Sequence, residues 1–244
     1  MNPFSYEAEL VAIAIFLYLY DSSVLLFSNE AILTNSAAGR WSAAWGWSGF
    51  VLAGKSLCML NPFTPHHPSF RLRWQFEEAD GLDADLAWTE RADLLKRIRL
   101  STLACAIGLF VLLPAGLFSS LGAYALIPGV AIVYGSAIVG LARLSAIRDR
   151  LGLGGIRFTG FAFECLACPP FSANMLRRVA LSQTIGESLT RAGARLADEE
   201  GWTRLRAYCE SRLDEELQST AEGTATRAGL EASKRRLQAM SAAR

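Results

Sequence analysis

Between Leu100 and Ala142 the chain contains no charged residue. A run of this length suits two helices that each cross a hydrocarbon layer of about 30 Å, since each crossing needs roughly 20 residues. A soluble domain can bury one such helix, but two in succession are rarely core helices. The sequence "SSLG" at 119–122 separates the two halves and fits only a tight turn. The run therefore predicts a membrane protein with a transmembrane helical hairpin over 100–144.

The composition agrees with a chain that has lipid around it. Hydrophobic residues make up 52% of the chain and charged residues 19%, against about 25% in an ordinary soluble domain. The formal net charge of +1 argues against nucleic acid as a partner, which would require a strongly basic face. The expected partner is the lipid bilayer.

A further apolar stretch precedes the hairpin and predicts a first transmembrane helix within residues 1–29. It runs from Leu10 to Ser28, with Asp21 as its only charged residue. A cleaved signal peptide would begin with a positively charged region and have a shorter apolar stretch. We therefore interpret the segment as an uncleaved anchor, which makes three spans in all.

Basic residues predict the orientation, because short cytoplasmic loops collect lysine and arginine. They flank both ends of the hairpin: Lys96, Arg97, Arg99, Arg143, Arg148 and Arg150. The residues before the first span contain two glutamates and no basic residue. Arginine far outnumbers lysine, a usage typical of GC-rich bacterial genomes. We therefore expect a bacterial inner membrane, with the N-terminus outside and the C-terminus in the cytoplasm.

Residues 30–82 predict a small cytoplasmic β-rich subdomain. The segment 45–60 is either a fourth span or a β-hairpin, and Lys55 favours the hairpin because a charge is costly within lipid. The sequence "FRLRWQF" at 70–76 alternates apolar and polar residues, which is typical of a half-buried strand. The aromatic segment 156–165 also has strand character, so residues 145–170 are expected to join the same sheet.

The remaining segments predict cytoplasmic helices. Residues 83–99 begin with an aspartate N-cap candidate and are expected to run directly into the second span. Residues 171–244 form a helical region, in which Gly223 interrupts the pattern. One helical face carries the apolar side chains of Trp202, Leu205, Cys209, Leu213 and Leu217. The predicted fold is an α-helical polytopic membrane protein with a small cytoplasmic β-sheet subdomain and a helical C-terminal region.

Asp21 is the first candidate site, because ionisable groups within a membrane are costly and usually face protein or water. It would lie about 16 Å from the outer end of the first span. Tyr18 and Ser22 are its nearest polar neighbours on that helix. The other two spans contain no basic residue, so an internal ion pair would require Arg99 or Arg143 to reach in from the cytoplasmic side.

Three interpretations of Asp21 remain open at this stage. The helix is shifted so that the carboxylate lies near the cytoplasmic headgroups, or the carboxylate pairs with another chain, or it belongs to a proton or ion pathway. The second interpretation predicts a protein partner, or self-association, through the first transmembrane helix.

The cysteines offer a second candidate site. Cys165 and Cys168 form the only Cys-x-x-Cys sequence, which suits a redox pair, half of a zinc site, or two packed cysteines. Zinc needs four ligands, and the only histidines, His66 and His67, are adjacent in a proline-rich loop. We expect packed cysteines, and no metal or cofactor.

Arg177 and Arg178 are candidates for contacts with lipid headgroups, although a solvated helix face is the simpler expectation. No nucleotide-binding or hydrolase motif occurs in the chain. The leading hypothesis is a non-catalytic accessory, scaffold or assembly subunit of a bacterial inner-membrane complex. The alternatives are a membrane-bound thiol redox or metal-dependent enzyme that uses Cys165 and Cys168, and an oligomeric ion or proton pathway that uses Asp21.

Overall fold

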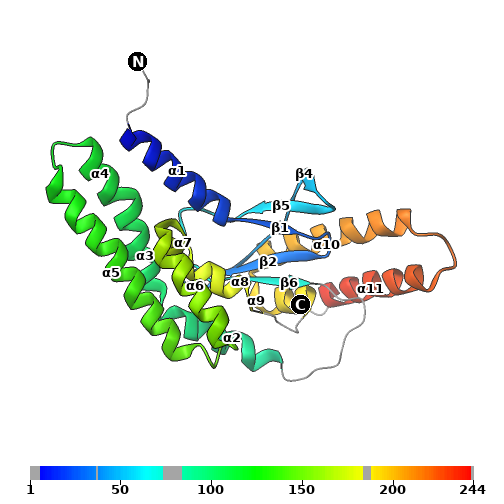
Figure 1. Ribbon diagram of the computed structural model, residues 1–244. Coiled ribbons are helices and arrows are strands. Elements are labelled where there is room, and N and C mark those ends of the chain that lie inside the picture. Colours follow the sequence, from blue (N-terminus) through cyan, green and yellow to red (C-terminus); the bar gives the residue numbers. More distant parts are fainter. Residues whose placement is uncertain (1–5, 37, 74–83, 184–187, 243–244) are drawn as a thin grey trace, which may run out of the picture. The chain divides into compact units, whose positions relative to one another are not determined.

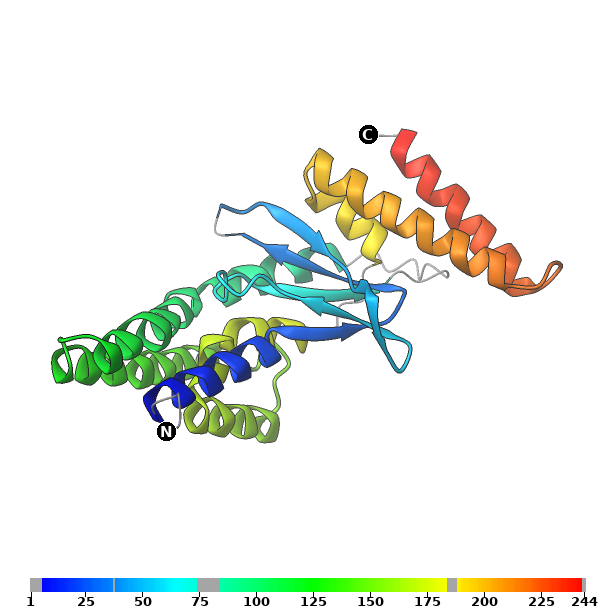
Figure 2. The ribbon, with the colours of Figure 1, turned by 90° about the horizontal axis from the view of Figure 1, so that it is seen from above.

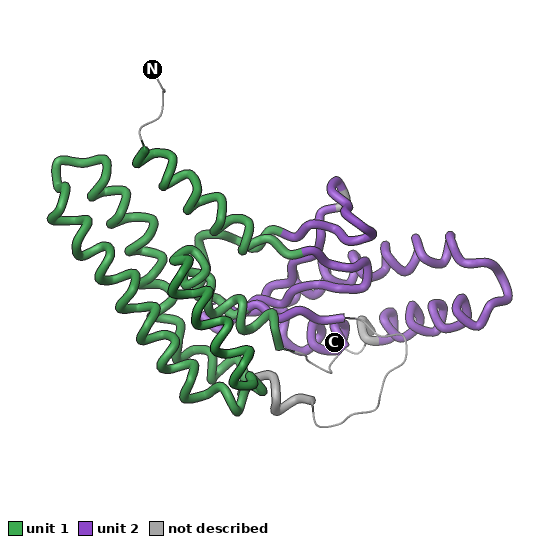
Figure 3. Tube along the Cα trace, in the orientation of Figure 1, with its two compact units in different colours: residues 1–24, 59–68, 89–183 green, residues 25–58, 69–88, 184–244 purple. Residues whose placement is uncertain are grey.

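The computed structural model describes residues 6–36, 38–73, 84–183 and 188–242. Two compact units divide the chain (Figure 3): unit 1 comprises residues 1–24, 59–68 and 89–183, and unit 2 comprises residues 25–58, 69–88 and 184–244. The protein is a mixed α/β structure, 65% helical with two three-stranded antiparallel sheets. The predicted class of a polytopic helical membrane protein with three spans is therefore wrong.

Within the described residues, two helical segments are long and apolar enough to cross a membrane, Arg99–Phe118 and Ala123–Ile147. They are a weak indication of membrane association. The expected first span is divided instead: α1 (Tyr6–Asp21) is followed almost at once by the strand β1 (Ser23–Leu26). The 16 residues of α1 measure about 24 Å, which is less than the thickness of the hydrocarbon layer. The apolar stretch at 10–28 was misleading because a helix and a half-buried strand share it.

The helical hairpin of unit 1 follows the predicted boundaries. Its first arm consists of α3 (Arg99–Ile107), the π-helical turn η1 (Gly108–Leu112) and α4 (Leu113–Phe118), and its second arm is α5 (Ala123–Ile147). Figure 1 shows the two arms side by side and antiparallel. The π-helical turn lies just before Pro114, which lacks the backbone N–H that an α-helix would require there.

Glycine lets the two arms approach closely. A Cβ atom on Gly116 would lie 2.6 Å from the backbone nitrogen of Leu126, and one on Gly129 would lie 2.9 Å from Leu113 Cδ2. Small residues at helix–helix contacts are typical of helices that associate in lipid, where packing replaces the hydrophobic effect.

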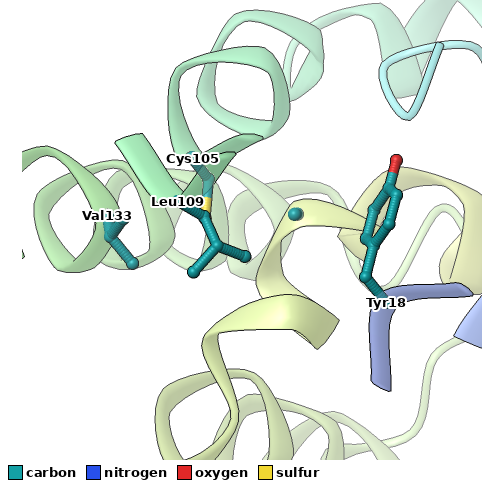
Figure 4. Packing of buried hydrophobic residues seen from close by; sticks show 5 residues of the cluster. Tyr18, Cys105, Leu109 and Val133 are labelled. Carbon is teal, nitrogen blue, oxygen red and sulfur yellow. The ribbon is translucent and has the colours of Figure 1, made fainter. Parts of the chain in front are cut away.

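The end of α1 packs into the same core. Figure 4 shows the side chain of Tyr18 facing Cys105, Leu109 and Val133, which belong to α3, η1 and α5. The rings of Tyr18 and Phe110 lie 4.6 Å apart. The burial of these groups fixes the C-terminal half of α1 to the hairpin.

Residues 155–181 form helices, so a second prediction is wrong. The segment 156–165, predicted as a strand of the cytoplasmic sheet, lies within the helix α6 (Gly155–Ala167). The short helices α7 (Pro169–Ala173) and α8 (Met175–Leu181) follow it. The inward residues of α6 recur at helical spacing: the buried Cys165 and the partly buried Phe161 and Ala162 pack in one cluster with Leu141 of α5. Of the aromatic residues that resembled strand alternation, Phe163 is exposed, whereas Phe158 and Phe161 are partly buried.

The predicted helix over 83–99 is shorter than expected. The helix α2 extends over Ala84–Lys96, and a turn at 97–98 separates it from α3. The helix α2 therefore does not continue directly into α3, the first helix of the hairpin.

Unit 2 contains the sheet with strand order β3–β2–β6, formed by β3 (Trp41–Ala44), β2 (Glu30–Asn35) and β6 (Ser69–Arg73). Both pairings are antiparallel, with Leu33 opposite Ala43 on one side and Phe70 on the other. The predicted strand at 70–76 is confirmed up to Arg73, and its remaining residues lie outside the described ranges.

The hairpin predicted within 45–60 is confirmed. Its strands β4 (Trp47–Leu52) and β5 (Lys55–Met59) pair antiparallel, and β5 also joins β1 in the order β1–β5–β4. Ala53 and Gly54 make the turn with φ angles of 50° and 75°. Positive φ at both central residues is the geometry that suits a two-residue β-hairpin.

The C-terminal helices of unit 2 are α9 (Leu189–Leu196), α10 (Glu199–Ser219) and α11 (Ala225–Ala242). In Figure 2, α10 and α11 lie side by side in opposite directions. Four of the five apolar residues predicted on one face of α10 are buried: Trp202, Leu205, Cys209 and Leu213. Trp45 stacks on Tyr208 of α10 with ring centroids 4.8 Å apart, while Trp47 is exposed.

Candidate functional site

The polar end of α1 and the helices α6 to α8 bring several ionisable residues of unit 1 together. We define the Asp21 cluster as Tyr18, Asp21, Ser22, Glu164, Asn174, Arg177 and Arg178. It contains every residue predicted around Asp21, together with Glu164 and Asn174, which the sequence analysis did not select.

Asn174 fixes the C-terminal end of α1. Its side-chain nitrogen donates to the carbonyl oxygen of Tyr18 at 3.3 Å and to Ser22 Oγ at 2.9 Å, and the residue is fully buried. The hydroxyl of Tyr18 donates to the carbonyl oxygen of Pro62. The carbonyl oxygen of Tyr18 also accepts from the backbone N–H of Ser22 at 2.9 Å, so these bonds add side-chain contacts to the last turn of α1.

Asp21 has a partner within its own chain. Its Oδ1 atom lies 3.4 Å from Nε of Arg178, and Arg178 also forms an ion pair with Glu164. The expectation that only Arg99 or Arg143 could reach Asp21 is therefore wrong. The partner could not be recognised from the sequence, because Arg178 lies in α8, far along the chain from Asp21 and after both apolar arms of the hairpin.

Aromatic rings hold the guanidinium group of Arg178 in place. Its central carbon lies 4.7 Å from the ring centroid of Phe171 and 5.2 Å from that of Phe161. Cation–π contacts of this kind are worth about 0.5–2 kcal/mol, more when the groups are shielded from water. Arg178 thus connects α1, α6 and α7 through two carboxylates and two rings.

Arg177 is bound by neutral oxygen atoms. Only 2% of it is exposed, and its Nη2 atom donates to the carbonyl oxygen of Thr64 at 2.7 Å, to Thr64 Oγ1 at 3.1 Å and to the carbonyl oxygen of Asn61. Arg177 is thus held inside unit 1, while 23% of the Arg178 side chain is exposed, and the headgroup contacts expected for these two arginines stay a prediction.

Burial dominates the electrostatics of the cluster. It raises the pKa of Asp21, and the charge of Arg178 only partly opposes the shift. It lowers the pKa of Arg177, which Tyr18 and Asp21 partly offset. For Arg178, burial lowers the pKa, but the hydrogen bond to Glu164 and the charge of Asp21 outweigh it, so the pKa is raised. Arg178 therefore stays charged throughout the physiological range.

The cysteine pair lies at the end of α6. Cys165 is buried, and burial raises the pKa of its thiol to about 12; burial also raises the pKa of Cys168. A nucleophilic thiol needs a lowered pKa, so neither cysteine has the environment of a redox residue. Ser172 donates to the carbonyl oxygen of Cys165 at 2.6 Å, a packing contact in the turn to α7.

The two histidines lie together in the loop at 61–68. Their ring centroids are 4.4 Å apart, which corrects the expectation that the adjacent side chains point in opposite directions. Burial, His66 and nearby arginines lower the pKa of His67 to about 4, so it is neutral at physiological pH. Among the described residues, no group of three or more His, Cys, Asp or Glu side chains is arranged to hold a metal ion.

The arrangement joins helices through ion pairs, hydrogen bonds and cation–π contacts. Arg178 balances two carboxylates, and Arg177 is committed to a loop backbone. Burial raises the pKa values of the Cys165 and Cys168 thiols near the end of α6. The Asp21 cluster therefore holds the end of α1 against α6, α7 and α8.

The comparisons with known proteins add no further constraint. No family model matches the chain, and neither the curated proteins nor the solved structures compared with it contain a match.

Proposed function

We propose that this protein is a non-catalytic accessory or assembly subunit of a bacterial inner-membrane complex. The hairpin of α3, η1, α4 and α5 anchors it in the bilayer, and unit 2 binds a partner protein on the cytoplasmic side. The apolar lengths of Arg99–Phe118 and Ala123–Ile147 support the anchor. The basic residues at both cytoplasmic ends of the hairpin support the orientation.

One observation supports binding of a partner by unit 2: the edge strand β4 exposes apolar side chains. Trp47 is 67% exposed and Val51 is 59% exposed, and Phe50 and Leu52 are exposed beside them. In the order β1–β5–β4, one side of β4 has no neighbouring strand in that sheet. An apolar edge strand is a ready site for an added strand of another protein, since backbone hydrogen bonds give affinity and side chains give specificity.

The partner site proposed here differs from the one expected at Asp21. Because Arg178 pairs with Asp21 inside the chain, the carboxylate does not require a second chain. The apolar side chains along α1, such as Leu10, Ile13 and Phe16, remain exposed. Any self-association through α1 would therefore be apolar and would not depend on Asp21.

The two alternative functions have less support. A thiol enzyme would need an accessible thiolate, whereas burial keeps Cys165 protonated. An ion pathway would need a chain of ionisable groups through the membrane, whereas Asp21 is held by Arg178 at the end of α1.

The proposal is tested by replacing one exposed apolar residue at a time. The protein is expressed at its natural level, extracted from native membranes in mild detergent and examined by native mass spectrometry. Val51→Arg places a charge on the β4 edge, and Phe63→Arg places the same charge at another exposed apolar position. We expect a stoichiometric partner with the wild type and with Phe63→Arg, and its loss with Val51→Arg. A wild-type protein that runs alone would refute the proposal.

A further inference from the structure

The helix α6 carries large apolar side chains on its surface. Ile156 is 92% exposed and Phe163 is 72% exposed, and Leu166 near the end of the helix is exposed as well. The helix packs inward through Cys165 and the partly buried Phe161 and Ala162, which lie against Leu141 of α5 and Met175 of α8. Soluble proteins seldom leave such side chains in water without a use for them.

Two polar side chains of α6 have partners within unit 1, while Arg157 near the start of the helix is exposed. Thr159 Oγ1 donates to the carbonyl oxygen of Gly155 at 3.0 Å, and the carboxylate of Glu164 pairs with Arg178. A helix in contact with lipid must satisfy its polar groups in this way, because the hydrocarbon layer offers no water to bind them. Satisfied polar groups beside exposed apolar ones fit a lipid neighbour better than an aqueous one.

Two contacts show that α6 runs back along α5. Near its start, the ring centroid of Phe158 lies 6.0 Å from the guanidinium carbon of Arg148, just beyond the end of α5. Seven residues later, Cys165 packs on Leu141, which lies seven residues before Arg148. Both separations correspond to about 10 Å of helix. The two helices are therefore antiparallel over this length. The C-terminal half of α6 lies beside the uncharged part of α5.

The turn after α6 reaches further along the hairpin. The carbonyl oxygen of Pro169, at the start of α7, lies 4.0 Å from Cys105 Sγ of α3. Cys105 is six residues, or about 9 Å, from Arg99 at the basic end of that arm. We name residues 163–169 the α6–α7 elbow. By the register with α5, Phe163 lies level with Arg143 and Cys165 with Leu141, so the elbow extends from the basic end of the hairpin into its uncharged part.

We infer that the α6–α7 elbow is a lipid-binding surface, with Phe163 and Leu166 in contact with acyl chains at the edge of the hydrocarbon layer. This inference rests on the proposed function, because it requires the hairpin to cross the bilayer. The internal ion pairs of Arg178 then have a clear physical role. They neutralise Asp21 and Glu164 at a depth where single charges are costly. The elbow is a re-entrant segment, which enters and leaves the layer on the same side.

The test uses a photoreactive phenylalanine, p-benzoylphenylalanine, placed at one position at a time in the full chain. The protein is assembled in nanodiscs of phosphatidylethanolamine and phosphatidylglycerol, irradiated and analysed by mass spectrometry for lipid adducts. Phe163 reports the elbow, and the probe changes this aromatic side chain conservatively. Ile127, exposed within α5, reports the membrane crossing, and Thr203, exposed on α10, reports a site away from lipid.

We expect lipid adducts at Phe163 and Ile127, each about tenfold above those at Thr203, because acyl chains would surround both probes. Adducts at Ile127 with only background at Phe163 would overturn the inference and leave the membrane anchor standing. Background at both positions would overturn the anchor and the proposed function with it. An adduct of Phe163 with protein in place of lipid would also refute the lipid surface.

Discussion

Arg178 is the residue on which the Asp21 cluster depends. Its side chain meets two carboxylates and two aromatic rings, so its loss would affect every helix that the cluster joins. Removing one partner of a buried ion pair leaves an uncompensated charge, whereas neutralising the other partner can be almost free of cost. The two members of the pair should therefore respond differently to substitution.

We expect Arg178→Met to lower the free energy of unfolding by about 3 kcal/mol, because Asp21 loses its counter-ion and two rings lose a cation. Asp21→Asn should change it by less than about 1 kcal/mol, since Arg178 keeps Glu164. Urea unfolding in detergent, followed by tryptophan fluorescence, measures both. Arg157→Met removes an exposed arginine from α6 as the matched control. Equal effects of Arg178→Met and Arg157→Met would contradict the proposed role of the cluster.

The raised pKa of Asp21 predicts how stability changes with pH. Between the pKa of the unfolded chain, about 3.9, and the raised pKa of the folded protein, the folded state binds more protons. The contribution of Asp21 to stability is therefore complete below the unfolded pKa and is lost as the pH rises through the folded pKa.

The comparison of wild type with Asp21→Asn isolates this contribution. We expect the stability of the wild type, relative to Asp21→Asn, to decline as the pH rises from about 4 and then to level off. Thermal midpoints of both proteins in one detergent, over a series of buffers, provide the measurement. A relative stability that rises with pH would show that Arg178 outweighs burial.

At the scale of elements, the helical hairpin depends on close packing of its two arms. A Cβ atom on Gly116 would lie 2.6 Å from the backbone nitrogen of Leu126, a position that cannot move without shifting α5. At Gly135, in the middle of α5, an added Cβ atom meets nothing within 4 Å. The two glycines therefore offer a matched pair.

We expect Gly116→Ala to destabilise the hairpin by about 1–3 kcal/mol through overpacking. Gly135→Ala should be neutral or stabilising by up to about 1 kcal/mol, because alanine favours a helix. Thermal midpoints in detergent distinguish the two variants. If Gly116→Ala is as stable as Gly135→Ala, the arms do not approach as closely as the structure describes.

At the scale of the whole molecule, the charge pattern predicts how the chain is threaded. Alkaline phosphatase folds to an active enzyme only outside the cytoplasm. We expect activity when it is fused within the turn at 119–122 and none when it is fused after Arg244, because basic residues at both ends of the hairpin favour the cytoplasm. An active C-terminal fusion would reverse the orientation, and inactivity of both fusions would argue against a crossing.

Much of the local structure could be predicted from the sequence. The boundaries of the hairpin, the β4–β5 hairpin and the buried face of α10 follow from uncharged length, turn residues and helical spacing. The strand prediction for 156–165 was wrong because a short aromatic segment fits both the two-residue period of a strand and the 3.6-residue period of a helix. Packing on α5 decides in favour of the helix. The first span failed for a related reason: hydropathy does not reveal that a helix ends and a strand begins within one apolar stretch.

The sequence by itself determined that this chain carries a long uncharged hairpin with basic residues at both ends, since length and charge are local properties. It also made Asp21 a costly residue that needed a partner. Only the tertiary structure decided that the partner is Arg178, which lies far along the chain, and that Glu164, Phe161 and Phe171 surround it. Ion pairs and cation–π contacts depend on distance in space, and no sequence pattern encodes the approach of α8 to the end of α1.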